Sequence, residues 1–375
     1  PSLHGIHYAS KHLKGWMKPS RRAVGIAFQP ASAKVIYQPL GVVGVIVPWN
    51  YPLFLAMGPL VGALSAGNRV MIKMSESTPA TSQLLRDLLA RVFPEDLVYV
   101  ALGEADVGVA FSRLPFDHLL FTGATSIGKH VMRAAAENLV PVTLELGGKS
   151  PAIVSADVPL ADAAERIAFG KTLNAGQTCV CVNRFLVQAG IYEQFIQRLN
   201  EKMQAFSIGN GLEGGHDIGP VINQNAVKKV QSHIQDALDK GAKLIRGGRP
   251  HAAGALFFEP TLIADVTPEM DVATQETFGP LAAVFKFETE RQALEMANDT
   301  DFGLASYCYT NNLGRAWRMS QQLEYGMVGI NKGIISNEVA PFGGVKHSGL
   351  GREGSKYGIE DYMEIKYTLF GGLAE

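Results

Sequence analysis

Apolar residues along this chain fall in short runs, and from about Pro39 these runs alternate with segments of helical length. Residues 41–47 (GVVGVIV) are apolar on both alternating faces, which is typical of a buried parallel strand. Thr78 followed by Pro79 is a typical helix start, because a hydroxyl can cap the first turn and proline fits its first position. The pattern predicts a doubly wound α/β sheet, with strands at residues 41–47, 69–73, 97–102 and 118–121 and helices at 51–64, from 78, and at 126–136.

A second alternation begins at Pro151. It predicts a further set of strands and helices, with strands at residues 184–187, 281–287, 306–309 and 326–330 and helices at 191–206, 226–240 and 292–298. The pair Gly147-Gly148 separates the two alternating regions. We expect a domain boundary there, because a chain of 375 residues is more typical of two domains than of one.

Composition narrows the functional classes. The chain has a net charge of −1 and no long basic run, so binding to nucleic acid or to an anionic membrane is not expected. The apolar stretch at residues 53–64 is interrupted by glycine and proline and is too short to span a membrane. Three cysteines are too few for a secreted disulfide framework, which favours a cytoplasmic protein. The nine histidines are scattered without ligand spacing, so no metal site is predicted.

Two motifs carry reactive side chains. Glu145 lies near the end of an apolar run at residues 142–146, where glycines begin, and a carboxylate in a partly dry pocket can relay protons near neutral pH. Cys179 follows the residues GQT in a loop of small and polar residues, and its thiolate can attack a carbonyl. A lone cysteine is more often an inert core residue. The polar loop nevertheless favours a nucleophile at this position.

The segment from Phe121 to Gly128 follows a predicted strand and opens a predicted helix. A helix N-terminus offers unpaired N–H groups and partial positive charge, which suit a pyrophosphate. Gly123 and Gly128 do not have the Gly-x-Gly-x-x-Gly spacing of a dinucleotide fingerprint, and only Ala124 between them is small. Taken alone, the segment is equally consistent with a plain strand–helix turn.

Five segments occur in the order that is typical of the aldehyde dehydrogenase superfamily, which the chain resembles along nearly its whole length. They are PWN at residues 48–50, FTG at 121–123, LELGGK at 144–149, NAGQTC at 174–179 and ETFGP at 276–280. The resemblance implies an aldehyde dehydrogenase-like α/β fold with a Rossmann-type NAD(P)-binding domain at residues 1–147, an α/β catalytic domain at 148–353 and a C-terminal oligomerisation tail at 354–375. Residues 20–38 would join that tail in a small sheet that pairs subunits in a homodimer or homotetramer. Members carry a further segment before the matching region, so we expect a truncated chain.

The same resemblance implies an NAD(P) site. Lys73 and Glu76 match residues that contact the adenosine ribose, and because a carboxylate repels a 2′-phosphate, Glu76 favours NAD, with NADP as the alternative. Glu276 and Phe278 match residues that hold the nicotinamide ribose and pack on the cofactor. Apart from the resemblance, the charged residues are consistent with ordinary surface positions and Phe278 with a core aromatic. The expected cofactor residues are Trp49, Lys73, Ser75, Glu76, Phe121, Gly123, Ala124, Gly128, Leu146, Gly147, Glu276 and Phe278.

The resemblance also assigns the chemistry. Cys179 would attack the aldehyde carbonyl to give a thiohemiacetal, while the amide of Asn50 and the backbone N–H of Cys179 stabilise the oxyanion. Hydride transfer to the nicotinamide would leave a thioester, and Glu145 would activate the water that hydrolyses it. Lys149 matches a position beside this base. A CoA-acylating dehydrogenase is an alternative that Glu145 argues against, and an inactive shell that serves a structural or binding role is another.

The two halves of the chain resemble different members of the superfamily. Residues before Cys179 resemble coniferyl-aldehyde dehydrogenases and those after it succinate-semialdehyde dehydrogenases, so the chain is either a natural mosaic or an artificial chimera. The second group holds a distal carboxylate with arginines and a serine, and Arg184 and Ser336 match one arginine and the serine. The other arginine is replaced by the apolar stretch at residues 51–59.

Losing one arginine–carboxylate contact should cost orders of magnitude in selectivity. We therefore predict hydrophobic aldehydes, medium- or long-chain aliphatic or aromatic, with succinate semialdehyde as the alternative. Arg184 could instead pair with a protein carboxylate. The expected substrate contacts are Tyr51, Leu55, Arg184, Ser336 and Phe342.

Cys181 lies near the expected nucleophile in the sequence. If the segment is extended, alternate side chains lie close together, and a reversible Cys179–Cys181 bond could silence the enzyme under oxidation. Cys308, in an apolar strand, is expected to be structural.

Overall fold

The chain folds into two compact units, and the computed structural model describes residues 2–371. Unit 1 holds residues 2–145, 336–343 and 350–371, and unit 2 holds residues 146–335 and 344–349. The first crossing lies between Glu145 and Leu146, close to the glycine pair at which the sequence predicts a boundary. The later return of the chain to unit 1 differs from the continuous span of 148–353 expected for the second domain.

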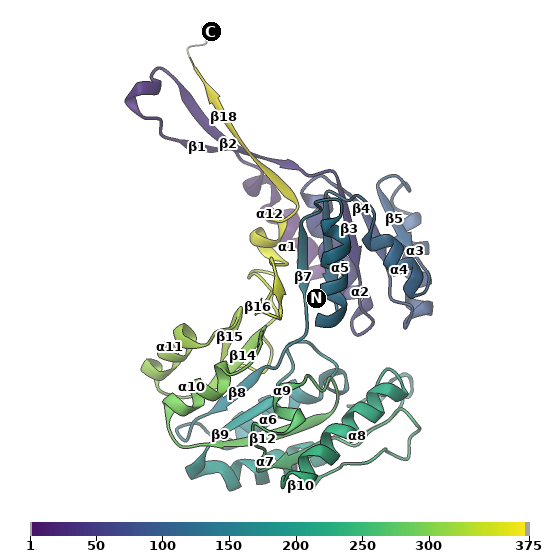
Figure 1. The fold of residues 1–375 in the computed structure, drawn as a ribbon, viewed down its shortest axis with the longest axis vertical. Helices are drawn as coiled ribbons and strands as arrows, with labels where there is room; N and C mark the ends of the chain where they lie inside the picture. The colour runs from purple at the N-terminus through teal and green to yellow at the C-terminus, as the bar shows by residue number, and fades with distance from the viewer. Residues whose placement is uncertain (1, 372–375) are drawn as a thin grey trace. The chain divides into compact units, whose positions relative to one another are not determined.

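Unit 1 is built on a six-stranded sheet (Figure 1). In their order across the sheet, its strands are β17 (Gly349–Leu350), β7 (Val142–Glu145), β6 (His118–Thr122), β3 (Val42–Ile46), β4 (Arg69–Lys73) and β5 (Val98–Ala101). β3 pairs in parallel with β4 and β6, and these pair in parallel with β5 and β7. The strand order therefore runs outward in both directions from β3, which is the arrangement of a doubly wound sheet.

One face of this sheet packs on the helix that follows β3. Val43 and Val45 of β3 and Ile72 of β4 are fully buried against Ala56 and Leu60 of that helix. The burial of these apolar side chains is the main stabilising contribution to the core of unit 1. The helices of unit 1 are α1 (Ser2–Trp16), α2 (Pro52–Ser65), α3 (Pro79–Ala90), α4 (Ala105–Ser112), α5 (Thr125–Ala136) and α12 (Ser355–Glu360).

The helix starts follow the sequence pattern with one difference in detail. α3 begins at Pro79 as expected, but the Thr78 side chain makes no capping hydrogen bond to the helix. Instead, the Ser82 hydroxyl donates to the Thr78 carbonyl at 2.8 Å. The apolar stretch at residues 53–64 lies within α2, and none of the helices formed by residues 2–371 is both long and apolar enough to cross a membrane.

A three-stranded antiparallel sheet extends from the rest of unit 1 (Figure 1). It consists of β1 (Ser20–Arg22), β2 (Ser32–Pro39) and β18 (Met363–Phe370), and a short 3-10 helix η1 (Ile26–Phe28) lies between β1 and β2. β18 pairs with β2 in unbroken register from Met363 opposite Pro39 to Phe370 opposite Ser32. Segments from the two ends of the sequence are thereby joined in one sheet, in the regions where the family resemblance places oligomerisation strands.

Unit 2 is built on a seven-stranded sheet in which every neighbouring pair except β10–β11 is parallel. In order across the sheet, the strands are β10 (Lys243–Arg246), β11 (Thr261–Ala264), β12 (Leu281–Phe287), β9 (Arg184–Gln188), β8 (Pro151–Val154), β14 (Ala305–Tyr309) and β15 (Met327–Ile330). A separate antiparallel pair is formed by β13 (Phe302–Gly303) and β16 (Val345–Lys346). Together the sheets and helices of the two units confirm the predicted α/β fold class.

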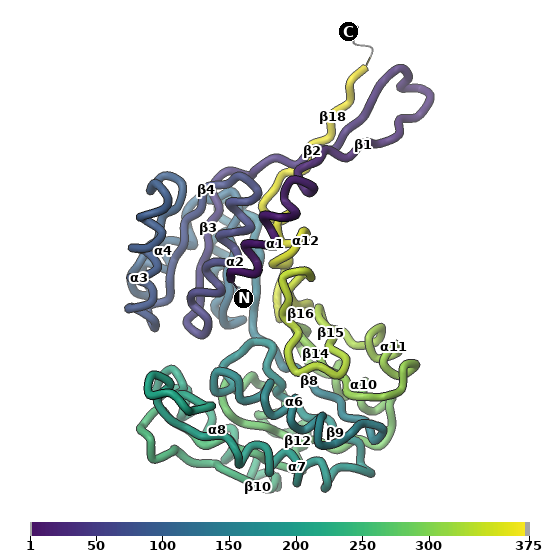
Figure 2. Tube along the Cα trace, turned by 180° about the vertical axis from the view of Figure 1, so that it is seen from behind, coloured from purple at the N-terminus to yellow at the C-terminus, as the bar shows by residue number. Residues whose placement is uncertain are grey.

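The helices of unit 2 cover this sheet with amphipathic faces. Val227, Val230 and Ile234 of one helix join the buried residues Ile263 and Phe285 of the sheet in one apolar cluster. Two further helices lie side by side in both views (Figures 1 and 2). The helix in this apolar cluster is α8 (Gln224–Asp239), and the two helices that lie side by side are α6 (Leu160–Thr172) and α7 (Tyr192–Gln204). The other helices of unit 2 are α9 (Asp271–Thr274), α10 (Glu290–Asn298), α11 (Leu313–Gln322) and the 3-10 helices η2 (Leu173–Gly176), η3 (Ala189–Ile191) and η4 (Gly211–Glu213).

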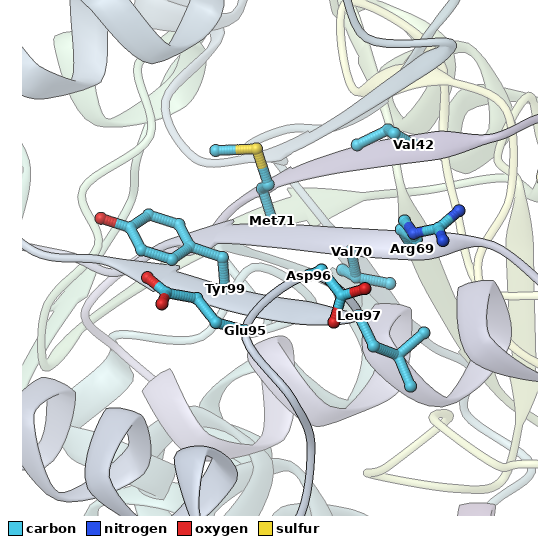
Figure 3. Close-up of a pocket in the computed structure, with 8 residues that line it drawn as sticks. All are labelled: Val42, Arg69, Val70, Met71, Glu95, Asp96, Leu97 and Tyr99. Carbon is cyan, nitrogen blue, oxygen red and sulfur yellow. The ribbon is translucent and has the colours of Figure 1, made fainter.

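A cavity of about 380 Å³ lies at the amino-terminal ends of β3, β4 and β5 (Figure 3). In doubly wound sheets, ligands bind at the opposite, carboxyl-terminal ends of the strands. None of the predicted site residues lines this cavity, whose lining residues are Val42, Arg69, Val70, Met71, Glu95, Asp96, Leu97 and Tyr99.

Candidate active site

Cys179 of unit 2 lies in a loop whose backbone is held in an uncommon shape. Asn174, Ala175 and Gly176 all have positive φ angles, of 50°, 54° and 77°. A Cβ atom at Gly176 would lie 2.2 Å from the Gly279 carbonyl oxygen, so only glycine fits there. Non-glycine residues with positive φ are often found at functional sites because the surrounding structure must stabilise them.

Side chains beneath this loop fix it in place. The Gln177 side chain donates to the Asn174 carbonyl at 3.0 Å and accepts from the Ile222 backbone N–H at 2.8 Å. The buried Tyr307 hydroxyl donates to the Val180 carbonyl at 2.7 Å. These contacts hold the residues on both sides of Cys179, which itself is only partly buried. The thiol is therefore on a rigid support with one side accessible.

Cys181 has surroundings that differ from those expected. The Cys181 N–H donates to the Thr178 carbonyl at 3.0 Å, so residues 178–181 form a turn rather than the extended segment that the hypothesis of a Cys179–Cys181 bond required. The Cys181 thiol is buried and donates to the Lys171 carbonyl at 3.4 Å, and burial raises its pKa. Such a thiol reacts slowly, because the thiolate is the reactive form. Cys308 is fully buried in β14 among apolar residues of the unit 2 core, which fits the structural role expected of it.

Glu145 of unit 1 is the last residue of β7 and is buried, and neither carboxylate oxygen accepts a hydrogen bond from any of residues 2–371. Gly343 lies directly beside it: a Cβ atom there would lie 2.7 Å from Glu145 Oε1. Burial raises the pKa of Glu145 well above its ordinary value, and the negative charge of Glu353 raises it further. A carboxyl group in this state can exchange a proton near neutral pH.

Sequence reasoning missed two acidic residues beside Glu145. Burial raises the pKa of Glu353 to about 7, so this group also titrates near neutrality. Asp361 acts on Glu145 as a further negative charge. The chain returns to unit 1 only after unit 2 is complete, so no local pattern in the sequence brings Glu353 or Asp361 next to β7.

The other predicted residues of unit 1 gather at the carboxyl-terminal ends of its strands. Trp49, Asn50 and Tyr51 follow β3 and precede α2, and Leu55 lies in the first turns of α2. Lys73 ends β4, and its buried ammonium donates to the Met74 carbonyl at 2.7 Å. Doubly wound sheets bind ligands at this edge.

The residues that follow β4 and β6 fit the adenosine half of a dinucleotide. Glu76 lies 3.8 Å from the Lys73 ammonium with its side chain 42% exposed, so it can still accept bonds from ribose hydroxyls. Ala124 caps α5 without a side-chain hydrogen bond, and the buried Thr122 Oγ1 has no partner among the residues that the structure describes. The first turn of α5 can therefore donate backbone hydrogen bonds to a phosphate. Ser75 lies in the connection after β4 and Gly123 in the connection after β6, while Phe121 lies in β6 and Gly128 in the first turns of α5.

Unit 2 carries the other predicted cofactor residues on two segments. One segment begins at Leu146, where the chain leaves unit 1, and the other follows α9. Glu276 accepts a hydrogen bond from the Gly148 N–H at 3.0 Å, and a Cβ atom at Gly147 would lie 2.6 Å from Glu276 Oε2. Leu146 is tied to the Ser348 carbonyl through its N–H at 2.9 Å. Phe278 has a positive φ of 53°. The carboxylate is thus placed by backbone contacts, which suits it to hold a ligand hydroxyl.

Lys149 is buried next to this carboxylate. Its ammonium donates to the Gln275 carbonyl at 2.6 Å, and burial, with the charges of Lys171 and Arg184, lowers its pKa. The resemblance places Lys149 beside the base. In unit 2 its contact is with the residue that precedes Glu276, so it supports the predicted cofactor residue.

Arg184 has a structural environment rather than one suited to a substrate. Its guanidinium donates to the carbonyls of Lys149 at 3.2 Å, Met296 at 2.7 Å and Ala297 at 2.7 Å, and to the Tyr325 hydroxyl at 3.0 Å. The side chain is buried, and its partners are carbonyls and a phenol rather than the protein carboxylate that was the alternative. Through these bonds the guanidinium links β9 to α10. We therefore do not retain Arg184 as a substrate ligand.

The remaining predicted substrate residues belong to unit 1. Ser336 begins the first segment that returns to that unit, and Phe342 pairs with Glu353 in an isolated backbone bridge. In unit 2, two apolar side chains that sequence reasoning missed precede the thiol: Phe169 is 49% exposed and Leu173 is 36% exposed. The Thr178 hydroxyl donates to the Leu173 carbonyl at 3.4 Å, so Leu173 is tied to the residue before Cys179.

Comparison with known proteins places these features in a family. The sequence pattern of the "Aldehyde dehydrogenase family" matches residues 4–368. The chain is 56% identical to a "Succinate semialdehyde dehydrogenase" of Acinetobacter baylyi, with 98% of this chain and 78% of that protein aligned. It is 54% identical to a "Probable coniferyl aldehyde dehydrogenase" of Pseudomonas aeruginosa, over 98% of this chain and 76% of that protein. The crystal structure of a Mycobacterium tuberculosis aldehyde dehydrogenase complexed with NAD+ superposes with a TM-score of 0.94 at 35% identity, covering 100% of this chain and 77% of that one.

Proposed function

As the chain belongs to the aldehyde dehydrogenase family and is an NAD(P)-dependent oxidoreductase acting on aldehydes, we propose that Cys179 is its nucleophile, Glu145 its general base and hydrophobic aldehydes its substrates. The observation that carries the assignment of the base is the buried Glu145 carboxyl, whose two oxygens have no hydrogen-bond partner within the described part of the chain. A group buried in this way is costly to the fold unless it serves another purpose.

The reaction divides between these residues. The Cys179 thiolate attacks the aldehyde carbonyl carbon, and the oxyanion that forms is stabilised by the Asn50 amide and the Cys179 N–H. NAD(P)+ would supply the hydride acceptor when bound, and loss of hydride from this adduct would leave an acyl thioester on Cys179. Glu145 takes a proton from water as the water attacks the thioester, and the carboxylic acid leaves with the thiol restored.

The predicted cofactor residues form two groups, one for the adenosine half and one for the nicotinamide half of NAD(P). The first turn of α5 and Lys73 with Glu76 would hold the pyrophosphate and the adenosine ribose, and Glu276 with Phe278 the nicotinamide half. We propose a preference for NAD over NADP, because the Glu76 carboxylate is partly exposed and would repel a 2′-phosphate. Ser75, Gly123 and the glycines beside Glu276 would support this cofactor through backbone contacts.

The substrate preference rests on the side chains around the thiol loop. Arg184 is buried and gives four of its five N–H groups to protein acceptors, which disfavours it as the ligand of a distal carboxylate. Phe169 and Leu173, in contrast, present apolar surface on the segment that leads to Cys179. Apolar surface favours an aliphatic chain or aromatic ring by the hydrophobic effect, at roughly 25 cal/mol for each Å² removed from water.

A kinetic comparison tests this preference. We expect kcat/KM, followed by NADH absorbance, to be higher for octanal or an aromatic aldehyde than for succinate semialdehyde. Leu173→Arg should raise kcat/KM for the semialdehyde about tenfold or more, because it adds a guanidinium at an exposed position that is tied to the residue before Cys179, whereas Leu173→Met should not. A parent enzyme that prefers succinate semialdehyde would refute the hydrophobic preference, absence of NADH formation with every aldehyde would favour an inactive shell, and dependence of turnover on CoA would favour an acylating enzyme.

A second candidate is oxidation of succinate semialdehyde. It is favoured by the 56% identity to a relative that carries that name. In this case a cation other than Arg184 would have to receive the distal carboxylate. The same comparison of aldehydes separates the two candidates.

We also propose that the chain works as a homo-oligomer. β1 and β18 are the outer strands of the three-stranded sheet, and Ile365 and Tyr367 of β18 are each 61% exposed. An exposed apolar edge strand is a typical site of pairing with another chain. Light scattering after size exclusion measures the mass directly, and Ile365→Lys with Tyr367→Lys should lower it if these strands pair subunits.

A further inference from the structure

A buried row of hydrogen-bonded side chains includes Thr143, which lies two residues before Glu145 in β7 of unit 1. The Thr143 hydroxyl donates to Asp361 Oδ2 at 2.9 Å, and His118 Nε2 lies 2.9 Å from the same hydroxyl oxygen. Since the Thr143 proton is given to Asp361, the His118 ring must donate to Thr143 as its Nε2–H tautomer. Burial lowers the pKa of His118 to about 4, which keeps the ring neutral at pH 7.

This row is directly coupled to the strand that carries the base. Thr143 and Glu145 are alternate residues of β7, so their side chains leave the same face of the strand. The fit on this face is close: a Cβ atom at Gly351 would lie 2.6 Å from Asp361 Oδ2 and 2.8 Å from Thr143 Oγ1. Asp361 Oδ2 also accepts from the Arg352 N–H at 3.2 Å. β7 and residues 351–361, which are distant in the sequence, thus meet at one carboxylate.

We propose that Asp361 is a positioning residue for Glu145: it holds the end of β7 through Thr143 and faces the base with a negative charge. The inference rests on the proposed role of Glu145. The charged groups that act on Glu145 are Glu353 and Arg352, which follow β17, and Asp361, which follows α12. Glu353 and Asp361 both oppose ionisation of Glu145, and Arg352 favours it.

The two contributions of Asp361 predict different results for two variants. Asp361→Asn removes the charge and keeps the shape, so Glu145 should ionise at a lower pH. Thr143→Val keeps every charge but removes the link between Asp361 and β7, so the base should be less well placed at all pH values. Glu360→Gln is the matched control, because Glu360 is adjacent to Asp361 but pairs with Lys356 at 3.7 Å.

The experiment follows the loss of the acyl group from Cys179 after a single turnover with octanal and NAD. Intact-protein mass spectrometry of quenched samples gives the rate constant of hydrolysis from about pH 5 to about pH 9, a range that spans the expected titration of the base. Asp361→Asn should move the acidic midpoint down by about half a unit to one unit, and Thr143→Val should lower the rate severalfold at every pH. Glu360→Gln should match the parent enzyme.

An unchanged midpoint in Asp361→Asn, or an equal shift in Glu360→Gln, would overturn the inference. If Asp361→Asn does not fold, an unchanged hydrolysis rate in Thr143→Val overturns it. Glu145→Gln, measured alongside, separates this result from failure of the proposed function. Normal hydrolysis in that variant would remove the base itself, whereas blocked hydrolysis with no effect of Asp361 removes only the positioning role.

Discussion

Arg184 in unit 2 and Glu145 in unit 1 are both buried ionisable side chains, but they differ in their hydrogen-bond partners and in the charges around them. Arg184 donates to three carbonyls and a phenol, so its charge is solvated by the protein. Neither oxygen of Glu145 has a partner among residues 2–371, and the group lies beside like charges. This contrast separates structural from chemical roles. A buried ionisable group with several protein partners fixes the fold, and one without partners is available to bind a proton or water.

The largest expected effect comes from removing the chemical groups. Cys179→Ser should lower turnover about a thousandfold or more, because a hydroxyl at neutral pH is a far weaker nucleophile than a thiolate. Glu145→Gln should still form NADH in a burst that does not exceed one equivalent and then stop, since only water activation is lost. Stopped-flow absorbance distinguishes the two variants. Multiple turnovers by Glu145→Gln at the parent rate would show that Glu145 does not have the chemical role that distinguishes it from Arg184.

Replacing the structural charge should affect stability instead. Arg184→Met leaves its acceptors unpaired in the interior, and we expect the free energy of unfolding to fall by about 3 kcal/mol or more. Denaturant titration measures this, with the exposed Arg198→Met as the control. The ratio of kcat/KM for octanal and succinate semialdehyde should stay unchanged in whatever fraction folds. A selective loss with the semialdehyde would return Arg184 to the substrate site.

A smaller effect is expected from the neutral His118 behind Glu145. The unfolded chain binds a proton at His118 with a pKa near its ordinary value of 6.5, and the folded chain only near 4. The unfolded state therefore binds more protons between these values, and the free energy of unfolding should fall by up to about 3 kcal/mol as pH drops from 6.5 to 4. Thermal melts across this range should show a shallower loss in His118→Gln. An equal slope in the variant would assign the loss to other groups.

The smallest effect concerns the exposed carboxylate of Glu76. Glu76→Gln removes the repulsion of a 2′-phosphate but keeps a hydrogen-bonding side chain. Because the side chain is partly in solvent, we expect the ratio of kcat/KM for NAD over NADP to fall only about tenfold. Initial rates with both cofactors measure the ratio. No change would show that Glu76 does not select the cofactor.

The sequence predicted the elements well where a local pattern decides them. β4 and β12 occupy the predicted residues 69–73 and 281–287, because both are apolar runs bounded by polar residues. Cap chemistry was less predictable: Thr78 precedes α3 but does not cap it through its side chain. A hydroxyl residue before a helix does not show whether its own side chain, or that of a neighbour such as Ser82, will form the hydrogen bond in the first turn.

The surroundings of the site residues were harder to predict. Arg184 matched a substrate ligand by type and position, but three of its four partners lie more than a hundred residues further along, in α10 and before β15. Neither spacing nor composition specifies such tertiary contacts. The Cys179–Cys181 hypothesis required an extended segment, whereas residues 178–181 form a turn after the positive φ angles of residues 174–176.

The path of the chain through the two units sets the order in which they are finished on the ribosome. Unit 2 has its last residue at position 349, whereas unit 1 must wait for β18 to pair with β2 and for Tyr362 to enter its core. The unit that begins first is thus completed last, against the usual order in which domains mature during synthesis. Glu353 and Asp361 are among these late arrivals. A nascent chain therefore already contains its thiol loop before the residues that surround Glu145 have been translated.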